Sequence, residues 1–155
     1  LDSRDPVDGG RVIAKAWTDP DFKKRLLEDG TAAVGEMGLT MGDAELVVVE
    51  NTDDVHNTIV CTLCSCYPRT LLGLPPDWYK SKSYRSRAVV EPRAVLKEFG
   101  TEVPDNVTVR VHDSNADMRY LVLPKQPEGT EDWPAEKLAE IVSRDALVGV
   151  VLPEA

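Results

Sequence analysis

All three cysteines of the chain lie within residues 61–66, between an apolar run and a proline. Thiols clustered this tightly are typical of a metal site or a redox site, because thiolates bind soft metals and exchange disulfides. The pair Cys64 and Cys66 favours a metal, since their sulfurs and the deprotonated backbone nitrogens of Ser65 and Cys66 can close fused, planar chelate rings. Cys61 can add a thiolate on one side of that plane, which leaves the opposite side open.

This donor set restricts the choice of metal. Square-planar nitrogen and sulfur donation indicates a transition metal such as cobalt, iron, nickel or copper. Zinc is disfavoured because it prefers tetrahedral thiolate or imidazole ligands and does not normally deprotonate backbone amides. An open coordination position predicts a Lewis-acid site rather than a structural staple. Because thiolates and amidates leave net negative charge around a trivalent ion, cationic donors are expected nearby.

Other interpretations of the cysteines stay open on these residues alone. Single cysteines are usually buried, inert side chains. A structural zinc site of the Cys3His type would recruit His56 or His112, the only two histidines of the chain. The C-x-x-C spacing of Cys61 and Cys64 is also compatible with a thioredoxin-like redox role.

Length and charge exclude several classes of protein. A chain of 155 residues is long enough for one domain with a real core. Its net charge of −9 argues against nucleic-acid partners and anionic membrane surfaces. No apolar run approaches the roughly 20 residues of a membrane span, and no signal-peptide pattern opens the sequence. Three clustered cysteines do not form a secreted disulfide framework, so we expect a cytoplasmic protein.

The remaining residues predict helices and strands without a regular βαβ rhythm, so we expect an α+β fold: a layered α/β/β/α single domain with a short N-terminal helical arm. Residues 1–10, with a Gly9-Gly10 pair, predict an arm, and the prolines after the cysteines predict a loop and turn region. The polar residues 113–117 between two apolar strands predict a hairpin. Predicted strands are 46–49, 55–61, 107–111 and 118–123, and predicted helices are 11–17, 19–30, 31–37, 91–100 and 135–142.

The sequence CTLCSCY at residues 61–67 resembles the metal-binding motif of the nitrile hydratase alpha subunit in its cobalt form. This resemblance implies a hydro-lyase subunit that hydrates a small-molecule nitrile to the amide. It also implies an alpha-like catalytic domain at residues 19–155, preceded by an N-terminal arm and helix at residues 1–18. Further matches occur at 16–20, 26–30, 72–80, 84–87, 91–93, 113–115, 119–120 and 127–131.

The resemblance assigns roles within the cysteine segment. Cys61, Cys64 and Cys66 would bind a trivalent metal together with the amide nitrogens of Ser65 and Cys66. Cys64 would be oxidised to a sulfinic acid and Cys66 to a sulfenic acid, which agrees with the oxidation chemistry of low-pKa thiolates. The catalytic residues would be Cys66, Cys64 and Ser65, with the Cys66 sulfenate acting as nucleophile or base. Thr62 resembles the cobalt form, so Co(III) is favoured over Fe(III).

Residues around the segment are expected to line the substrate pocket or to support the metal ligands. Asp113 and Arg119 resemble a family pair that supports the site by hydrogen bonding, and Asp117 falls where the family often carries a glutamate. Trp78 and Tyr79 are expected to pack in the core or an interface, and a place near the substrate pocket is the alternative. The full predicted set is Thr62, Tyr67, Arg69, Trp78, Asp113, Asp117 and Arg119.

The resemblance also predicts partners. A beta-type subunit would supply arginines to the oxidised cysteines, and an activator protein would load the metal. Arg69 departs from the family, which usually carries tryptophan there, and a cation favours polar or anionic substrates. The gamma subunit of thiocyanate hydrolase has the same type of centre and resembles the chain at this position. Hydrolysis of thiocyanate is therefore the alternative to hydration of a nitrile. A short alpha subunit also fits a nitrile hydratase with a divided beta partner, such as the one acting on toyocamycin.

A third interpretation belongs to a different class of function. The chain would then be a metal-accepting subunit that is inactive without its partners. A metal-carrier role would give labile divalent metal and unoxidised cysteines. A purely structural role would make assembly with a partner independent of the metal.

Overall fold

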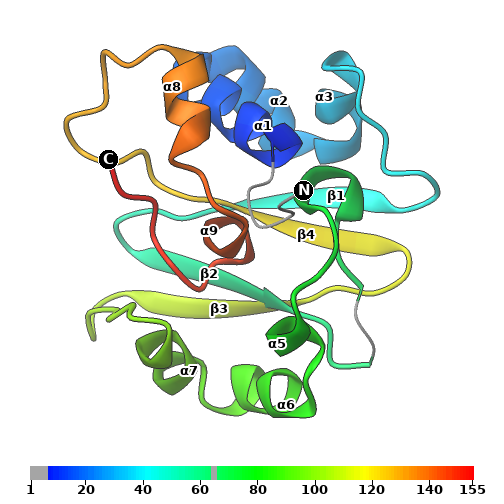
Figure 1. Cartoon of the computed structure of the whole chain (residues 1–155), viewed down its shortest axis with the longest axis vertical. Helices are drawn as coiled ribbons and strands as arrows, with labels where there is room; N and C mark the ends of the chain where they lie inside the picture. The colour runs from blue at the N-terminus through cyan, green and yellow to red at the C-terminus, as the bar shows by residue number, and fades with distance from the viewer. Residues whose placement is uncertain (1–6, 64–65) are drawn as a thin grey trace.

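Within residues 7–63 and 66–155, which the computed structural model describes, four strands pair into two small parallel sheets (Figure 1). Strand β1 (Glu45–Glu50) pairs with β4 (Met118–Leu123), and β2 (Val55–Val60) pairs with β3 (Thr108–Asp113). In register, Glu45 lies opposite Met118 and Val55 lies opposite Thr108. Each sheet therefore joins an early strand to a late one.

The predicted hairpin across residues 113–117 is wrong. β3 and β4 lie in different sheets, so the turn between them carries the chain from one sheet to the other, as residues 51–54 do between β1 and β2. The physical reason lies in burial. β4 ends in the continuous apolar run Leu121–Leu123, which is fully buried, as is typical of parallel strands that are covered on both faces.

Helices cover the outer face of each sheet, so the layered α/β/β/α arrangement is confirmed (Figure 1). Helix α9 contacts both β4 and β2, and lies between the two sheets. The helices over the β1–β4 sheet are α1 (Val7–Thr18), α2 (Pro20–Glu28), α3 (Gly30–Glu36) and α8 (Ala135–Glu140). Those on the β2–β3 side are α5 (Asp77–Lys80), α6 (Lys82–Val90) and α7 (Pro92–Glu98), while α4 (Arg69–Leu72) packs on α1 and α9 spans Arg144–Val148.

The helix start predicted at Asp19-Pro20 is confirmed. The Asp19 carboxylate accepts a hydrogen bond from the Phe22 amide at 3.1 Å, and Pro20 occupies the first helical position. Asp29 ends this helix and caps the next one, by accepting from the Ala32 amide at 3.1 Å. One aspartate at each boundary therefore satisfies backbone donors that a helix start would otherwise leave unpaired.

The N-terminal arm predicted for residues 1–10 is wrong for residues 7–10, because α1 already begins at Val7. Both glycines lie inside the helix, where small residues permit close packing. A Cβ atom at Gly10 would lie 2.9 Å from the Ala139 carbonyl oxygen, and one at Gly9 would lie 2.8 Å from that of Leu71. Residues 1–6 lie outside the described part of the chain, and the domain boundary after residue 18 stays a prediction.

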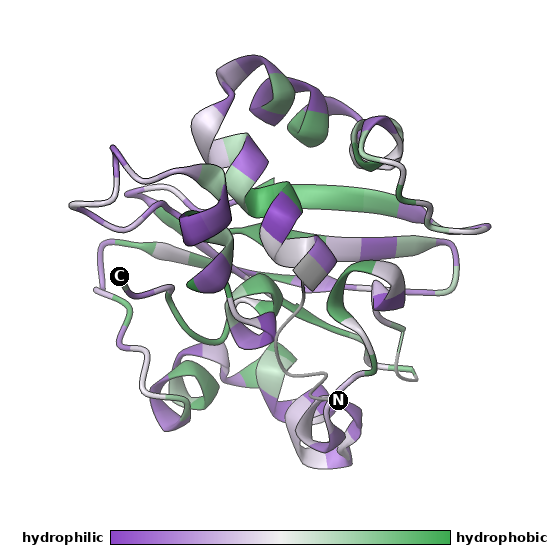
Figure 2. Ribbon diagram, turned by 45° about the horizontal axis from the view of Figure 1, so that its top comes forward, coloured by the Kyte–Doolittle hydropathy of each residue, from purple (hydrophilic) through white to green (hydrophobic). Residues whose placement is uncertain are grey.

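The core fills the space between the layers. Figure 2 shows hydrophobic residues along the strands and on the inward sides of the helices, with hydrophilic residues outside. Cys61 and Tyr67 belong to this core, so both flanks of the cysteine segment are anchored in it. No described helix has the length and apolar character needed to span a membrane. The largest fully buried side chains include Ile13, Phe22, Leu26, Ile59, Tyr67, Leu71, Tyr79, Leu96, Leu121 and Leu138.

We expect the substitution Gly149→Ala to lower the free energy of unfolding by about 3 kcal/mol. Gly149 ends α9 with φ of +92°, and a Cβ atom there would lie 2.2 Å from the Asn57 carbonyl oxygen. Urea denaturation of the purified protein measures the change. Gly35→Ala is the matched control, since Gly35 is helical with open space around it and should give no loss. Equal stability of the two variants would contradict this packing.

Candidate metal centre

The cysteine segment leaves the carboxyl end of β2. Cys61 follows the strand directly and is 1% exposed, while Cys66 is half-buried and packs against the core. The predicted ligands Cys64 and Ser65 lie outside the described residues, so the geometry of the full donor set stays a prediction. Cys61 and Cys66, at the two described ends of the segment, both pack in or against the core. Their sulfur donors fit a soft or borderline transition metal.

Asp113 holds the amino-terminal flank of the segment. It ends β3 directly opposite Val60 at the end of β2, so the parallel pairing brings it to the loop. Its carboxylate accepts from the Thr62 amide at 2.9 Å and from the Thr62 hydroxyl at 2.6 Å. The next amide, that of Ser114, donates to the Val60 carbonyl at 2.7 Å. The structure thus brings Thr62 and Asp113 together. Each carboxylate oxygen of Asp113 accepts one hydrogen bond from Thr62.

Arg119 holds the carboxyl-terminal flank. Its guanidinium donates to the Tyr67 carbonyl oxygen at 2.7 Å and, through Nε, to the Asn115 carbonyl oxygen at 2.9 Å. One cation therefore joins the start of β4 to the residue that follows the last cysteine. Asp117 lies in the same turn with an exposed side chain, and its own carbonyl accepts from the Glu45 amide at 2.7 Å. Asp117 thus contributes main-chain contacts to the turn.

Two tyrosines from the α5–α6 helices reach the same segment. The Tyr79 hydroxyl donates to the Cys66 carbonyl oxygen at 2.8 Å, and the Tyr84 hydroxyl donates to the Ile59 carbonyl oxygen at 2.6 Å. Burial raises the pKa of both hydroxyls well above 10.0, and for Tyr79 the neighbouring Tyr84 and Cys61 raise it further. Both phenols therefore remain protonated donors. The sequence predicted packing for Tyr79, with a place near the substrate pocket as the alternative, and no local pattern linked its hydroxyl to the Cys66 carbonyl.

Tyr67 and Trp78 lie in the aromatic cluster beneath the loop. The Tyr67 ring centroid is 4.8 Å from that of Tyr79, while Trp78 packs edge-on against Tyr84 at 5.0 Å and Phe99 at 4.7 Å. The Tyr67 hydroxyl is buried without a hydrogen-bond partner among the described residues, and burial raises its pKa. In these described contacts Trp78 packs between helices, and its predicted place at a substrate pocket stays a prediction.

Exposed residues lie close to the cysteines along the sequence. Arg69 begins α4 just after the cysteines and is exposed. Leu63 and Leu74 are 86% and 63% exposed, respectively, which is unusual for leucine beside a packed core. The described surface near the cysteines therefore combines a cation with exposed apolar side chains.

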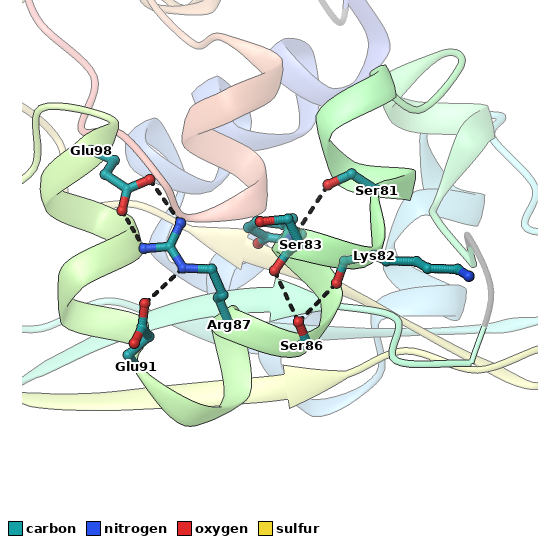
Figure 3. A network of polar contacts seen from close by, with 8 residues as sticks. Ser81, Lys82, Ser83, Ser86, Arg87, Glu91 and Glu98 are labelled. Carbon is teal, nitrogen blue, oxygen red and sulfur yellow. Dashed lines mark hydrogen bonds and ion pairs between the residues drawn. The ribbon is translucent and has the colours of Figure 1, made fainter.

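Helix α6 also carries the basic residues Arg85 and Arg87. Arg87 donates through Nε to Glu91 at 2.7 Å, and its terminal nitrogens contact Glu98, which ties α6 to α7 (Figure 3). Ser81 accepts from the Tyr84 amide at 3.1 Å and so caps α6. Arg85 has a buried Nε without a hydrogen-bond partner in the described part of the chain. Arg87 is thus a structural brace of the helices that carry the two tyrosines.

Both histidines are engaged away from the cysteines. His56 Nε2 lies 2.7 Å from the Gly149 carbonyl oxygen, near the start of β2 and thus at the opposite end of the strand from Cys61. His112 Nε2 lies 2.8 Å from Asn57 Oδ1. Among the described residues, no group of three or more His, Cys, Asp or Glu side chains could hold a metal ion. These contacts give no support to a zinc site that recruits a histidine.

The described flanks of the cysteine segment leave the end of a strand and are held by side chains from both sheets and from the neighbouring helices, an arrangement suited to a family of subunits built around such a segment. The family model described as nitrile hydratase, alpha chain, matches residues 1–151 of the sequence. The chain belongs to the nitrile hydratase alpha-chain family, and the resemblance found in its sequence is confirmed.

Individual relatives agree with this assignment. The low-molecular weight cobalt-containing nitrile hydratase subunit alpha of Rhodococcus rhodochrous is 54% identical over 149 residues, which cover 96% of this chain and 72% of the relative. Thiocyanate hydrolase subunit gamma of Thiobacillus thioparus is 45% identical over 161 residues, covering 96% of this chain and 66% of its own length. A double mutant of the Fe-type nitrile hydratase from Comamonas testosteroni Ni1 has a TM-score of 0.93 at 48% identity, covering 97% of this chain and 74% of that one.

The names of these relatives give two different metals. Cobalt is named for the Rhodococcus subunit, whereas iron is named for the structurally similar Comamonas enzyme. Membership of the family therefore supports a metal centre without deciding between the two ions.

We expect the free energy of unfolding to fall as the pH decreases below about 6.5, the ordinary pKa of histidine. Burial lowers the pKa of His56 and of His112 in the folded state. Between the two pKa values of each ring, the unfolded chain binds more protons than the folded one, so acidification destabilises the fold until the folded pKa is passed.

Urea denaturation at a series of pH values measures this dependence. In the variant His56→Gln, the amide can still donate to Gly149. The free energy of unfolding of this variant should depend less steeply on pH, because only His112 still contributes to the dependence. An unchanged pH dependence in this variant would contradict the assignment to His56.

Proposed function

We propose that this chain is the metal-binding catalytic subunit of a nitrile hydratase, which adds water to a nitrile and yields the amide. The observation that carries the proposal is the family match over residues 1–151, which includes all three cysteines. The Thr62 residue after the first cysteine supports Co(III), and Fe(III) is the alternative. The catalytic domain is residues 19–155, with residues 1–18 as an arm and helix, and the location is cytoplasmic.

The cysteine segment supplies the ligands and a reactive oxygen. Cys61, Cys64 and Cys66 hold the metal by sulfur, and Ser65 and Cys66 hold it by backbone nitrogen. When bound, the metal supplies Lewis-acid chemistry toward nitrile or water. Cys64 would be present as a sulfinic acid and Cys66 as a sulfenic acid, after four-electron and two-electron oxidation by an external oxidant. The Cys66 sulfenate oxygen takes the proton from the attacking water or itself attacks the nitrile carbon.

The residues around the segment position these groups. Asp113 fixes Thr62 through two hydrogen bonds, and Arg119 fixes the Tyr67 carbonyl. Because both contacts reach the flanks of the segment, they orient the cysteines without competing for their sulfurs. Trp78 and Asp117 are the remaining residues of the proposed pocket.

A beta-type subunit is the proposed partner, and it supplies arginines to the oxidised cysteines. The exposed Leu63, which lies within the cysteine segment, supports a partner at this site, because exposed apolar side chains are typical of interaction surfaces. An anionic thiolate cage also requires cationic hydrogen-bond donors. A metal-loading activator protein completes the proposed set of partners.

We expect Cys64→Ala and Cys66→Ala each to abolish both metal retention and nitrile turnover in the assembled enzyme. Each variant removes a sulfur ligand, and a chelate that loses one donor no longer holds the ion in the required geometry. Metal analysis and an amide-formation assay measure the two losses. Ser65→Ala is the control for metal retention, because the proposed ligand at that position is the backbone nitrogen.

Native mass spectrometry of the assembled enzyme separates this proposal from its alternatives. Tightly bound cobalt and added oxygen on the 61–66 peptide support the hydratase. Labile divalent metal with unoxidised cysteines would indicate a carrier. Turnover that appears only after a partner and an activator are added would identify a metal-accepting subunit that is silent alone.

Hydrolysis of thiocyanate is the second candidate activity, and Arg69 favours it. This exposed cation follows the cysteines closely, and thiocyanate is an anion. The relative thiocyanate hydrolase subunit gamma is 45% identical to the chain. Electrostatic attraction at the loop would lower KM for an anion and leave that of a neutral nitrile unchanged.

We expect Arg69→Trp to lower activity toward thiocyanate by about tenfold, which corresponds to about 1.4 kcal/mol of lost attraction. Activity toward a neutral nitrile should be kept or raised. Steady-state kinetics with both substrates measures the ratio, and Arg11→Trp, which changes an exposed arginine of α1 outside the cysteine segment, serves as the matched control. A wild-type enzyme without activity on thiocyanate would remove this candidate.

A further inference from the structure

Two buried tyrosines contact opposite flanks of the cysteine segment. Tyr79 donates to the carbonyl of Cys66, the last cysteine, and Tyr84 donates to the carbonyl of Ile59, shortly before Cys61. We propose that Tyr79 and Tyr84 form a clamp of positioning residues that holds both ends of the cysteine loop and slows the loss of the metal. This inference rests on the proposed function, since it concerns the same site.

The accepting groups give the clamp its effect. The Cys66 carbonyl belongs to the residue that would bind the metal through both its sulfur and its nitrogen, so holding this oxygen restrains the backbone to which both donors are attached. Ile59 lies within β2, and its carbonyl is held from the helical side while β3 pairs with the strand. A strand residue shortly before the loop and the last cysteine of the loop are therefore both held by tyrosines from one pair of helices.

The donating side chains are held rigidly. Tyr79 is 0% exposed and Tyr84 is 5% exposed, and their ring centroids lie 5.8 Å apart. Tyr79 also packs on Tyr67 at 4.8 Å and Tyr84 on Trp78 at 5.0 Å. Because each ring contacts other rings, a phenol oxygen could move away from its carbonyl only if the rings of the cluster were repacked.

The helices that carry the tyrosines are fixed relative to each other. Ser81 lies between α5 and α6, donates to the Trp78 carbonyl at 2.8 Å and accepts from the Tyr84 amide at 3.1 Å. Arg87 then joins α6 to α7 through Glu91 and Glu98 (Figure 3). The spacing between the two phenols is therefore set by structure outside the loop.

Release of a chelated metal requires local opening of the loop that holds it. Opening at Cys66 would break its hydrogen bond to Tyr79, and the buried phenol would be left unpaired. Supporting hydrogen bonds of this kind typically change metal affinity by 10- to 100-fold. The clamp should therefore act on metal retention before it acts on the chemical step.

The test uses the cobalt-loaded enzyme with its beta-type partner and compares wild type with Tyr79→Phe and Tyr84→Phe. Each substitution removes one hydroxyl and keeps the ring. We expect release of cobalt into a chelator to become about tenfold faster or more in each variant, with a shift of the sulfur-to-metal absorption band. Tyr120→Phe, which removes a hydroxyl from a half-buried tyrosine on β4, is the matched control and should release cobalt at the wild-type rate.

A variant that lowers stability without touching the loop separates positioning from general destabilisation. Phe22→Leu in α2, on the far side of the β1–β4 sheet, should lower Tm and leave the absorption band unchanged. Release rates and spectra of both Tyr→Phe variants equal to those of Tyr120→Phe would overturn the clamp. A wild-type enzyme that retains no metal would instead overturn the proposed function itself.

Discussion

The parallel pairing of β2 with β3 is the interaction on which the site depends. It places the end of β3 opposite the end of β2, so that Asp113 lies beside the residue that follows Cys61. If the register slipped by one residue, the carboxylate would move to the other face of the sheet. Thr62 would then lose both of its hydrogen bonds, and the amino-terminal flank of the loop would no longer be fixed. The position of the loop is thus a property of the sheet.

Several of the described contacts around the cysteine segment are made to main-chain atoms. Carbonyl oxygens of Ile59, Cys66 and Tyr67 accept from Tyr84, Tyr79 and Arg119, respectively. Such contacts constrain the backbone on both sides of the cysteines and do not themselves use a sulfur atom. This division suits a site in which sulfur must do chemistry, because ligands held only by the metal would move whenever their oxidation state changed.

Much of this arrangement could be predicted from the sequence. The strands, the helix start at Asp19 and the layered fold follow from apolar patterns and capping residues, and the cysteine motif identifies the family. Helix α6 was missed because its polar and apolar residues are not segregated to separate faces, and its tyrosine contacts arise only from tertiary packing. The pairing of β3 with β2 rather than with β4 was missed for the same reason: strand patterns give burial, whereas the choice of neighbour is a property of the whole chain. Tyr79 could not be assigned to the loop until that packing was known.

The strand order also constrains when the site can form. Each sheet needs a strand from the first half of the chain and one from the second, so neither can close while the chain is still being synthesised up to β2. Contacts between distant segments form late and make folding slow. The cysteines therefore emerge well before Asp113 and Arg119, which fix their flanks. A newly made chain passes through a period in which its thiols are exposed but not yet held, and this interval is when protection from premature oxidation or from the wrong metal matters most.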